Sequence, residues 1–80
     1  MNNRRMLSVE EKELIQTIYK EGTIVELDFM SDAQAPPSGT RGEVILVDSL
    51  GQIHVKWDNG SSLALIPKVD RFHTVKKEEY

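Results

Sequence analysis

Two histidines, His54 and His73, and scattered carboxylates are the side chains of this sequence that could do acid–base or metal chemistry. Catalysis requires titratable groups that converge on one point, and neither histidine stands in a spacing typical of metal ligands. His54 alternates with Ile53 and Val55, which predicts a solvent-facing residue of a strand, and His73 is similarly placed beside Phe72. We therefore expect no catalytic residue, no metal site and no cofactor, and the sequence does not predict an enzyme.

Two further patterns could bind a cation or a phosphate group, but both have simpler explanations. Asp28 and Asp32 adjoin a segment rich in turn residues, where carboxylates more often cap turns than bind a metal. The run Gly39-Thr40-Arg41-Gly42 lacks the Lys-Ser/Thr ending and the following helix of a phosphate-binding loop. Its two glycines, Gly39 and Gly42, are therefore predicted to serve a tight turn.

Trp57 could stack on a base or a proline ring if its indole were exposed. It shares the parity of Ile53 and Val55, however, and so should point into the interior of a small β fold. The sequence therefore predicts that Trp57 fills the core.

A helix is predicted from about Val9 to Lys20. The sequence Ser8-Val9-Glu10-Glu11 has the form of a capping box, and Gly22 provides a stop signal. One face of this helix is apolar, which predicts that it packs on the rest of the domain or forms a dimer or partner-binding face; its residues are Leu14, Ile15, Ile18 and Tyr19.

From Thr23 the apolar period changes to two, since Val25, Leu27 and Phe29 alternate with acidic residues and predict a strand with one buried face. Residues 30–40 contain two prolines and no periodic pattern, which predicts a long surface loop. The apolar run in 43–47 predicts a strand covered on both faces, with its inward set left open.

The next two strands are predicted to form a hairpin around Asp58-Asn59-Gly60. A three-residue loop places Val55 opposite Leu63 and Ile53 opposite Leu65, so that the apolar residues share one face, and it requires Gly60 in the left-handed region. Pro67 ends the fourth strand, and residues 72–75 can form a fifth. The expected fold is mainly β: a five-stranded SH3-like barrel (22–76) after a capped helix (1–21), with a frayed tail (77–80).

Composition narrows the function classes. The 80-residue chain has no Cys, which excludes a disulfide framework, and its net charge of −3 disfavours general attraction to nucleic acid. The basic start runs into Glu10, Glu11 and Glu13 without an apolar stretch, so we expect no signal peptide, no membrane span and a cytoplasmic protein.

A set of motifs between about residues 20 and 75 carries a family resemblance: Gly22-Thr23-x-Val25-Glu26-Leu27, then Asp32-x-Gln34-Ala35-Pro36-Pro37-x-Gly39-Thr40-x-Gly42-x-Val44, Val47-Asp48, and Gly51-x-Ile53-x-Val55-x-Trp57-Asp58-Asn59-Gly60-Ser61-x-Leu63. Together they resemble a small bacterial family of domains of unknown function, number four-three-one-four. The resemblance implies a bacterial protein, often encoded on phage or other mobile elements, and no known activity.

A second similarity runs from Gly39 to Val44, which is similar to the KOW-type strand and loop of ribosomal and transcription-elongation proteins. It implies contact with RNA or protein. The charges of 41–75 disfavour phosphate binding because they balance: Arg41, Lys56, Lys68 and Arg71 stand against Glu43, Asp48, Asp58 and Asp70.

The first hypothesis for function is a non-catalytic protein-interaction adaptor with an unknown protein partner. Its candidate surface combines the long loop with outward strand residues: Asp32, Gln34, Pro36, Pro37, Arg41, His54 and Lys56. The alternative is a KOW-like nucleic-acid- or ribosome-associated module that uses Arg41, Lys56, Arg71, Arg4, Arg5, Lys76 and Lys77. A homodimer through the apolar helix face stays open.

Overall fold

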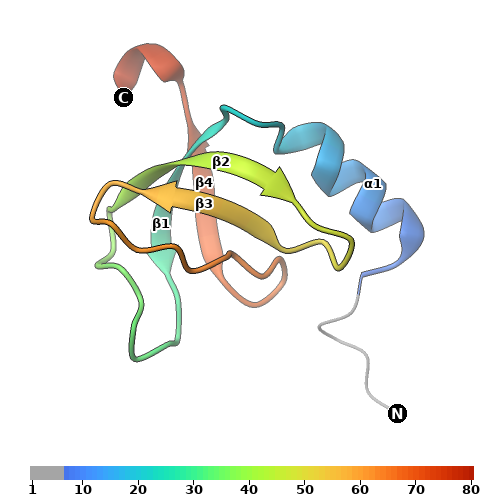
Figure 1. The fold of residues 1–80 in the computed structure, drawn as a ribbon, viewed down its shortest axis with the longest axis horizontal. Coiled ribbons are helices and arrows are strands. Elements are labelled where there is room, and N and C mark those ends of the chain that lie inside the picture. Colours follow the sequence, from blue (N-terminus) through green and yellow to red (C-terminus); the bar gives the residue numbers. More distant parts are fainter. Residues whose placement is uncertain (1–6) are drawn as a thin grey trace.

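In the computed structural model, which describes residues 7–80, one helix precedes a four-stranded antiparallel sheet (Figure 1). The elements are α1 (Val9–Ile18), β1 (Ile24–Phe29), β2 (Arg41–Val47), β3 (Ile53–Trp57), β4 (Arg71–Val75) and a 3₁₀ helix, η1 (Lys77–Glu79). The strands lie in the order β3-β2-β1-β4. In Figure 1, β2 and β3 lie in front of β1 and β4, and α1 lies to one side. Among the described residues, no helix is both long enough and apolar enough to cross a membrane.

The predicted capping box begins α1. The Glu11 N–H donates to Ser8 Oγ at 3.1 Å, and the Ser8 N–H donates back to Glu11 Oε1 at 2.9 Å. The helix ends at Ile18, slightly before the predicted Lys20. Gly22 then adopts φ +92° and its N–H bonds the Val44 carbonyl at 2.8 Å, which leads the chain into β1.

The fold is mainly β, as predicted, but the sheet has four strands and is not closed into a barrel, so the predicted five-stranded SH3-like barrel is not confirmed. The expected strand after the hairpin is reduced to one bridge between Ile53 and Leu65. To continue that ladder, Leu63 would have to pair with Val55. Its carbonyl instead accepts a hydrogen bond from the Trp57 indole at 2.8 Å, and its N–H donates to a serine hydroxyl at 3.3 Å. Side chains thus occupy the backbone groups that a longer strand would need.

The predicted three-residue hairpin loop is confirmed. The Gly60 N–H donates to the Trp57 carbonyl at 3.0 Å, and the Trp57 N–H donates to the Ser61 carbonyl at 3.3 Å, so Asp58, Asn59 and Gly60 form the loop. Gly60 has φ +90°, the left-handed conformation that the loop requires.

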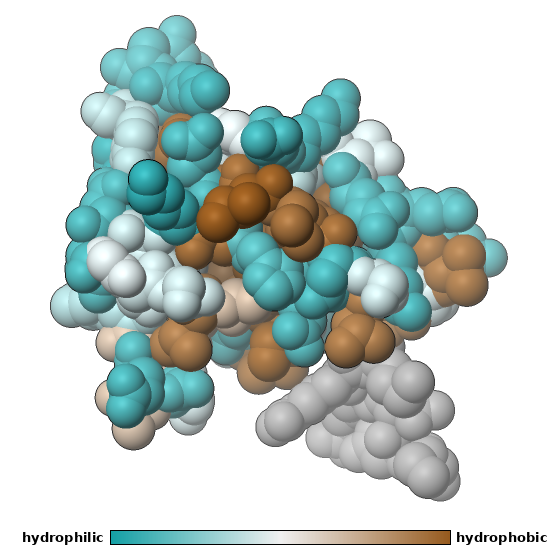
Figure 2. Space-filling model, viewed as in Figure 1, coloured by the Kyte–Doolittle hydropathy of each residue, from teal (hydrophilic) through white to brown (hydrophobic). Residues whose placement is uncertain are grey.

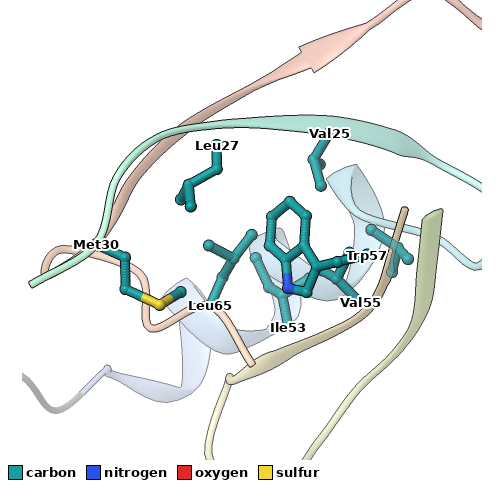
Figure 3. Close-up of a cluster of buried hydrophobic side chains, with 8 residues drawn as sticks. Val25, Leu27, Met30, Ile53, Val55, Trp57 and Leu65 are labelled. Atoms are coloured by element: carbon teal, nitrogen blue, oxygen red, sulfur yellow. The ribbon is translucent and has the colours of Figure 1, made fainter. Parts of the chain in front are cut away.

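The hydrophobic core lies inside the curved sheet, where Trp57 packs among side chains from β1, β3 and the segment after β3 (Figure 3). Trp57 is only 2% exposed, so its predicted core position is confirmed. The cluster comprises Val25, Leu27, Met30, Val44, Ile53, Val55, Trp57 and Leu65.

Two β-bulges interrupt the inward–outward alternation. The first, where β1 pairs with β4, lies between Leu27 and Phe29; Phe29 is 57% exposed and Met30 is buried in its place, so the predicted burial of Phe29 is wrong. The second, where β2 pairs with β3, lies between Val44 and Leu46. Val44 is buried, but Ile45 and Leu46 are both about half exposed, so the expectation that both faces of this strand are covered is also wrong.

The tail predicted to be frayed is held against the sheet. The Arg41 guanidinium donates from Nη1 to the Glu79 carbonyl at 2.6 Å, and Tyr80 Oη donates to Asp58 Oδ1 at 2.5 Å. Residues 77–79 form η1, whose last residue, Glu79, makes the first of these contacts and is followed directly by Tyr80. Sequence reasoning missed this because both partners lie far away in the chain.

Candidate functional site

The structure divides the predicted interaction surface into two groups. Arg41, His54 and Lys56 lie on the outward face of β2 and β3, since they alternate with buried neighbours. Asp32 and Gln34 are exposed on the long loop.

The long loop is folded back and paired at its base. The Leu27 N–H donates to the Thr40 carbonyl at 2.8 Å, and the Gly39 N–H donates to the Leu27 carbonyl at 2.7 Å. Gly39 has φ +90°, as expected of a tight turn. Asp32 Oδ1 accepts the Gln34 N–H at 2.7 Å, which confirms the turn chemistry predicted for this aspartate.

One loop residue does not belong to the predicted surface. Pro36 is buried, whereas Pro37 is exposed. The neighbouring Ala35 packs against the hydrophobic core, so the middle of the loop is turned inward. Pro36 therefore supports the fold, and its assignment to the binding surface is wrong.

Gly42 has a different role from the predicted turn. It lies within β2, paired with Val25 on one side and Trp57 on the other. A Cβ there would lie 2.6 Å from Val55 Cγ1 and 2.7 Å from the Lys56 carbonyl oxygen. Only glycine permits this close approach of two backbones.

An apolar patch lies on the outward face of β2. Because of the second bulge, Ile45 and Leu46 follow one another in sequence yet are 49% and 48% exposed. Figure 2 shows apolar surface over β2 with hydrophilic surface around it. On β3, His54 pairs with Leu46, and Lys56 pairs with Glu43 of β2, so polar side chains border the patch.

His54, which borders the apolar patch, is held in place by a hydrogen bond to Asp48. His54 Nε2 lies 2.8 Å from Asp48 Oδ2, and Asp48 Oδ1 accepts the N–H groups of Leu50 and Gln52 at 2.9 Å. Burial by itself would raise the pKa of Asp48, but these hydrogen bonds outweigh it and lower the pKa. The β2–β3 turn therefore holds the His54 ring in place.

A network of charged side chains crosses β1, β2 and β4. Arg41 Nε donates to Glu26 Oε1 at 2.9 Å, and His73 lies between two carboxylates, with Nδ1 3.0 Å from Asp28 Oδ2 and Nε2 3.7 Å from Glu26 Oε2. The hydrogen bond to Asp28 raises the pKa of His73, with the nearby carboxylate charges adding to it. One potential ligand atom from each of Glu26, Asp28 and His73 lies within 4.8 Å of the others. Since Arg41 already supplies a positive charge to Glu26, the geometry favours an ion-pair network over a metal site.

The predicted apolar face of α1 is divided. Ile15 and Tyr19 pack against the core, and the Tyr19 ring lies 5.4 Å from that of Phe72, centroid to centroid. Leu14 and Ile18 are 58% and 49% exposed. Half of the face thus attaches the helix, as the packing interpretation predicts, and the other half has no cover within residues 7–80.

Comparison with models of known protein families assigns the sequence to one of them. The model described as "Domain of unknown function (DUF4314)" matches residues 8–75. The chain belongs to this family. This confirms the resemblance drawn from the glycine and proline motifs. No curated protein and no solved structure is significantly similar to the chain.

The match shows which elements make up the DUF4314 domain. It starts at Ser8, the N-cap of α1, and stops at Val75, the end of β4, so that helix and sheet belong to one family unit. The tail with η1 lies beyond the match, although it contacts Arg41 and Asp58 within it.

Sequence reasoning missed the two residues at the centre of the outward face of this DUF4314 domain. Four consecutive apolar residues are typical of a strand covered on both faces, so the sequence predicts that Ile45 and Leu46 are covered. The bulge that exposes both has no turn residue to mark it. The only signal that could have indicated them is the apolar run 44–47 itself. A strand with one buried face needs an apolar residue only at every second position, so this run contains more apolar residues than such a strand can bury.

Proposed function

We propose that this DUF4314 domain is a non-catalytic protein-binding adaptor, and that its partner binds the outward face of β2 and β3. The observation that carries the proposal is the exposed pair Ile45 and Leu46 at the second bulge. Bulges recur where a strand must re-aim its side chains, and grouped apolar side chains with a polar rim are typical of protein-binding surfaces. We further propose that the adaptor acts in the cytoplasm of bacteria or among the proteins of a mobile element, and the family resemblance supports the bacterial part of this proposal.

The polar groups near the patch support binding better than catalysis. The histidine on each edge strand of the sheet is bonded to a carboxylate: His54 of β3 to Asp48, and His73 of β4 to Asp28. Catalytic acid–base groups converge on a space that a substrate can enter. Here the two pairs lie on opposite edge strands, β3 and β4, and neither histidine lines the open hollow of about 370 Å³ beside β3, whose lining is Glu43, Lys56, Trp57, Asp58, Gly60 and Tyr80.

The KOW-like alternative would use the basic residues for phosphate contacts. Arg41 is committed to Glu26 and to the Glu79 carbonyl, and Lys56 stands opposite Glu43 in the ladder. Arg4 and Arg5, which the alternative also uses, lie outside the described residues. With a net charge of −3, the chain would need a local basic patch to attract a phosphate backbone. Because Arg41 and Lys56 already lie beside carboxylates or a carbonyl, a protein is favoured over nucleic acid as the partner.

The test is affinity capture with tagged full-length protein from a bacterial lysate, comparing the parent with an Ile45→Ser/Leu46→Ser variant. Both side chains are half exposed, so the variant should fold, which circular dichroism would verify. A matched control, Gln16→Ser, changes an exposed residue on α1. We expect proteins captured by the parent and the control to be lost with the double variant. Capture that survives the double substitution, or that disappears on nuclease treatment, would overturn the proposal.

A further inference from the structure

Within residues 7–80, a second surface that no other element covers lies between α1 and β4. A groove of about 310 Å³ runs there, with Ile15 and Tyr19 of the helix on one side and Pro67 and Phe72 on the other. The Lys68 ammonium spans its mouth to Glu11 Oε2 at 2.7 Å.

The exposed residues of α1 change from apolar to acidic with increasing distance from this groove. Residues four apart lie above one another on a helix, so Ile15 and Tyr19 form the half-buried row that attaches α1. The next row outward contains the exposed Leu14 and Ile18, which extend the apolar surface of the groove into solvent.

Carboxylates border this apolar row. Glu10 continues the row of Leu14 and Ile18 toward the helix N-terminus, and Glu13 begins the next row outward. The lysine of the helix, Lys12, lies on the opposite flank, beside Gly51 of the β2–β3 turn. Lys68 does not offset these carboxylates because it is paired with Glu11, which lowers the pKa of that glutamate.

We propose that this groove binds a basic amphipathic helix of a partner protein, at a surface separate from the outward face of β2 and β3. Apolar side chains of the partner helix would lie along Leu14 and Ile18 and enter the groove toward Phe72. Its lysines or arginines would contact Glu10 and Glu13. This is the helix-in-groove mode of recognition, with charge complementarity setting the partner's sign.

A second copy of the chain is the other occupant to consider. A two-fold pairing of α1 along Leu14 and Ile18 would run the helices antiparallel, so that Glu10 and Glu13 of one copy lie beside the C-terminal end of the other copy's helix. That end offers a single lysine, Lys20, followed directly by Glu21. A basic partner helix can instead place a positive charge against each of the two carboxylates, so charge favours it over a second copy.

The experiment is selection of a phage-displayed library of random helical peptides against the full-length protein. We expect enriched peptides to carry net positive charge and apolar residues at helical spacing. Binding of a representative peptide should weaken at least about tenfold for Leu14→Ser/Ile18→Ser and severalfold for Glu10→Gln/Glu13→Gln. The control Gln16→Ser should leave binding unchanged.

Several results would overturn the inference. They are failure to enrich any peptide, enrichment of acidic or neutral peptides, or binding that persists on both double variants. Sedimentation that shows a dimer dissolved by Leu14→Ser/Ile18→Ser would assign the groove to a second copy instead. The Ile45→Ser/Leu46→Ser variant should bind the peptides normally, so failure at this groove is distinguishable from failure of the proposed adaptor surface.

Discussion

Replacing Gly42 by alanine should destabilise the domain strongly, although alanine is a small residue. The added Cβ would lie 2.6 Å from Val55 Cγ1, 2.7 Å from the Lys56 carbonyl oxygen and 3.0 Å from Trp57 Cα. Ordinary contacts between carbon atoms lie near 3.5–4.0 Å, so β3 must move away from β2 by roughly 1 Å. Two of the obstructing atoms belong to the backbone and cannot rotate away.

The size of the expected loss of stability depends on the core residues that β3 contributes. Its inward residues Ile53, Val55 and Trp57 are at most 2% exposed, so a shift of the strand disturbs the core. Overpacking costs about 1–3 kcal/mol, and the rigid backbone places Gly42→Ala at about 2–3 kcal/mol. A chain of this length has roughly 4–12 kcal/mol of stability in total. The melting temperature should therefore fall by roughly 10–20 °C.

Urea denaturation followed by Trp57 fluorescence measures this loss, with Gly39→Ala as the control. A Cβ at Gly39 meets no heavy atom within 4 Å, and only its φ of +90° opposes alanine, at a cost of about 1 kcal/mol. If Gly42→Ala lies within about 0.5 kcal/mol of the parent, or costs less than Gly39→Ala, the close approach of β2 and β3 is not what requires glycine.

Three further predictions concern single side chains. Titration of the imidazole by NMR should give His73 a pKa above its usual value, and Asp28→Asn should remove the shift. Because the folded-state pKa is the higher one, this contact stabilises the fold fully below about pH 6.5 and is lost as the pH rises through the folded value, which urea denaturation across that range would detect. The hydrogen bond to Asp58 raises the pKa of Tyr80, so ultraviolet titration should show its phenol ionising later than in Asp58→Asn. Trp57→Phe removes the indole N–H that bonds a backbone carbonyl at 2.8 Å and should cost about 1–3 kcal/mol in urea denaturation; a loss below about 0.5 kcal/mol would contradict the role given to that bond.

Local chemistry made several elements predictable from the sequence. The capping box at Ser8, the left-handed Gly60 and the inward Trp57 each depend on residues close together in the chain, and each was confirmed. The pairing of Ile53 with Leu65 was also correct, because one face of the hairpin had to be apolar.

What the sequence could not predict depends on contacts between distant segments. The bulges at Asp28 and Ile45 arise from how β1 and β2 pair with their neighbours, and one extra residue reverses the parity of everything beyond it. The core position of Pro36 and the attachment of Tyr80 likewise require the folded sheet as a surface to pack on. The candidate site was predicted only as far as His54, Lys56 and their neighbours alternate outward along regular strands.

The bulge in β2 is the point at which stability and the proposed function oppose each other. A regular strand continuing the parity of the buried Val44 would turn Leu46 inward, toward the core side chains of β3. Full burial of a leucine contributes about 1.5–3 kcal/mol, a large part of the roughly 4–12 kcal/mol available to a chain of this size. Departures from local consistency that cost stability are expected at functional sites. A polar residue at Leu46 should therefore affect partner binding much more than folding, whereas the same change at Val44 should unfold the domain.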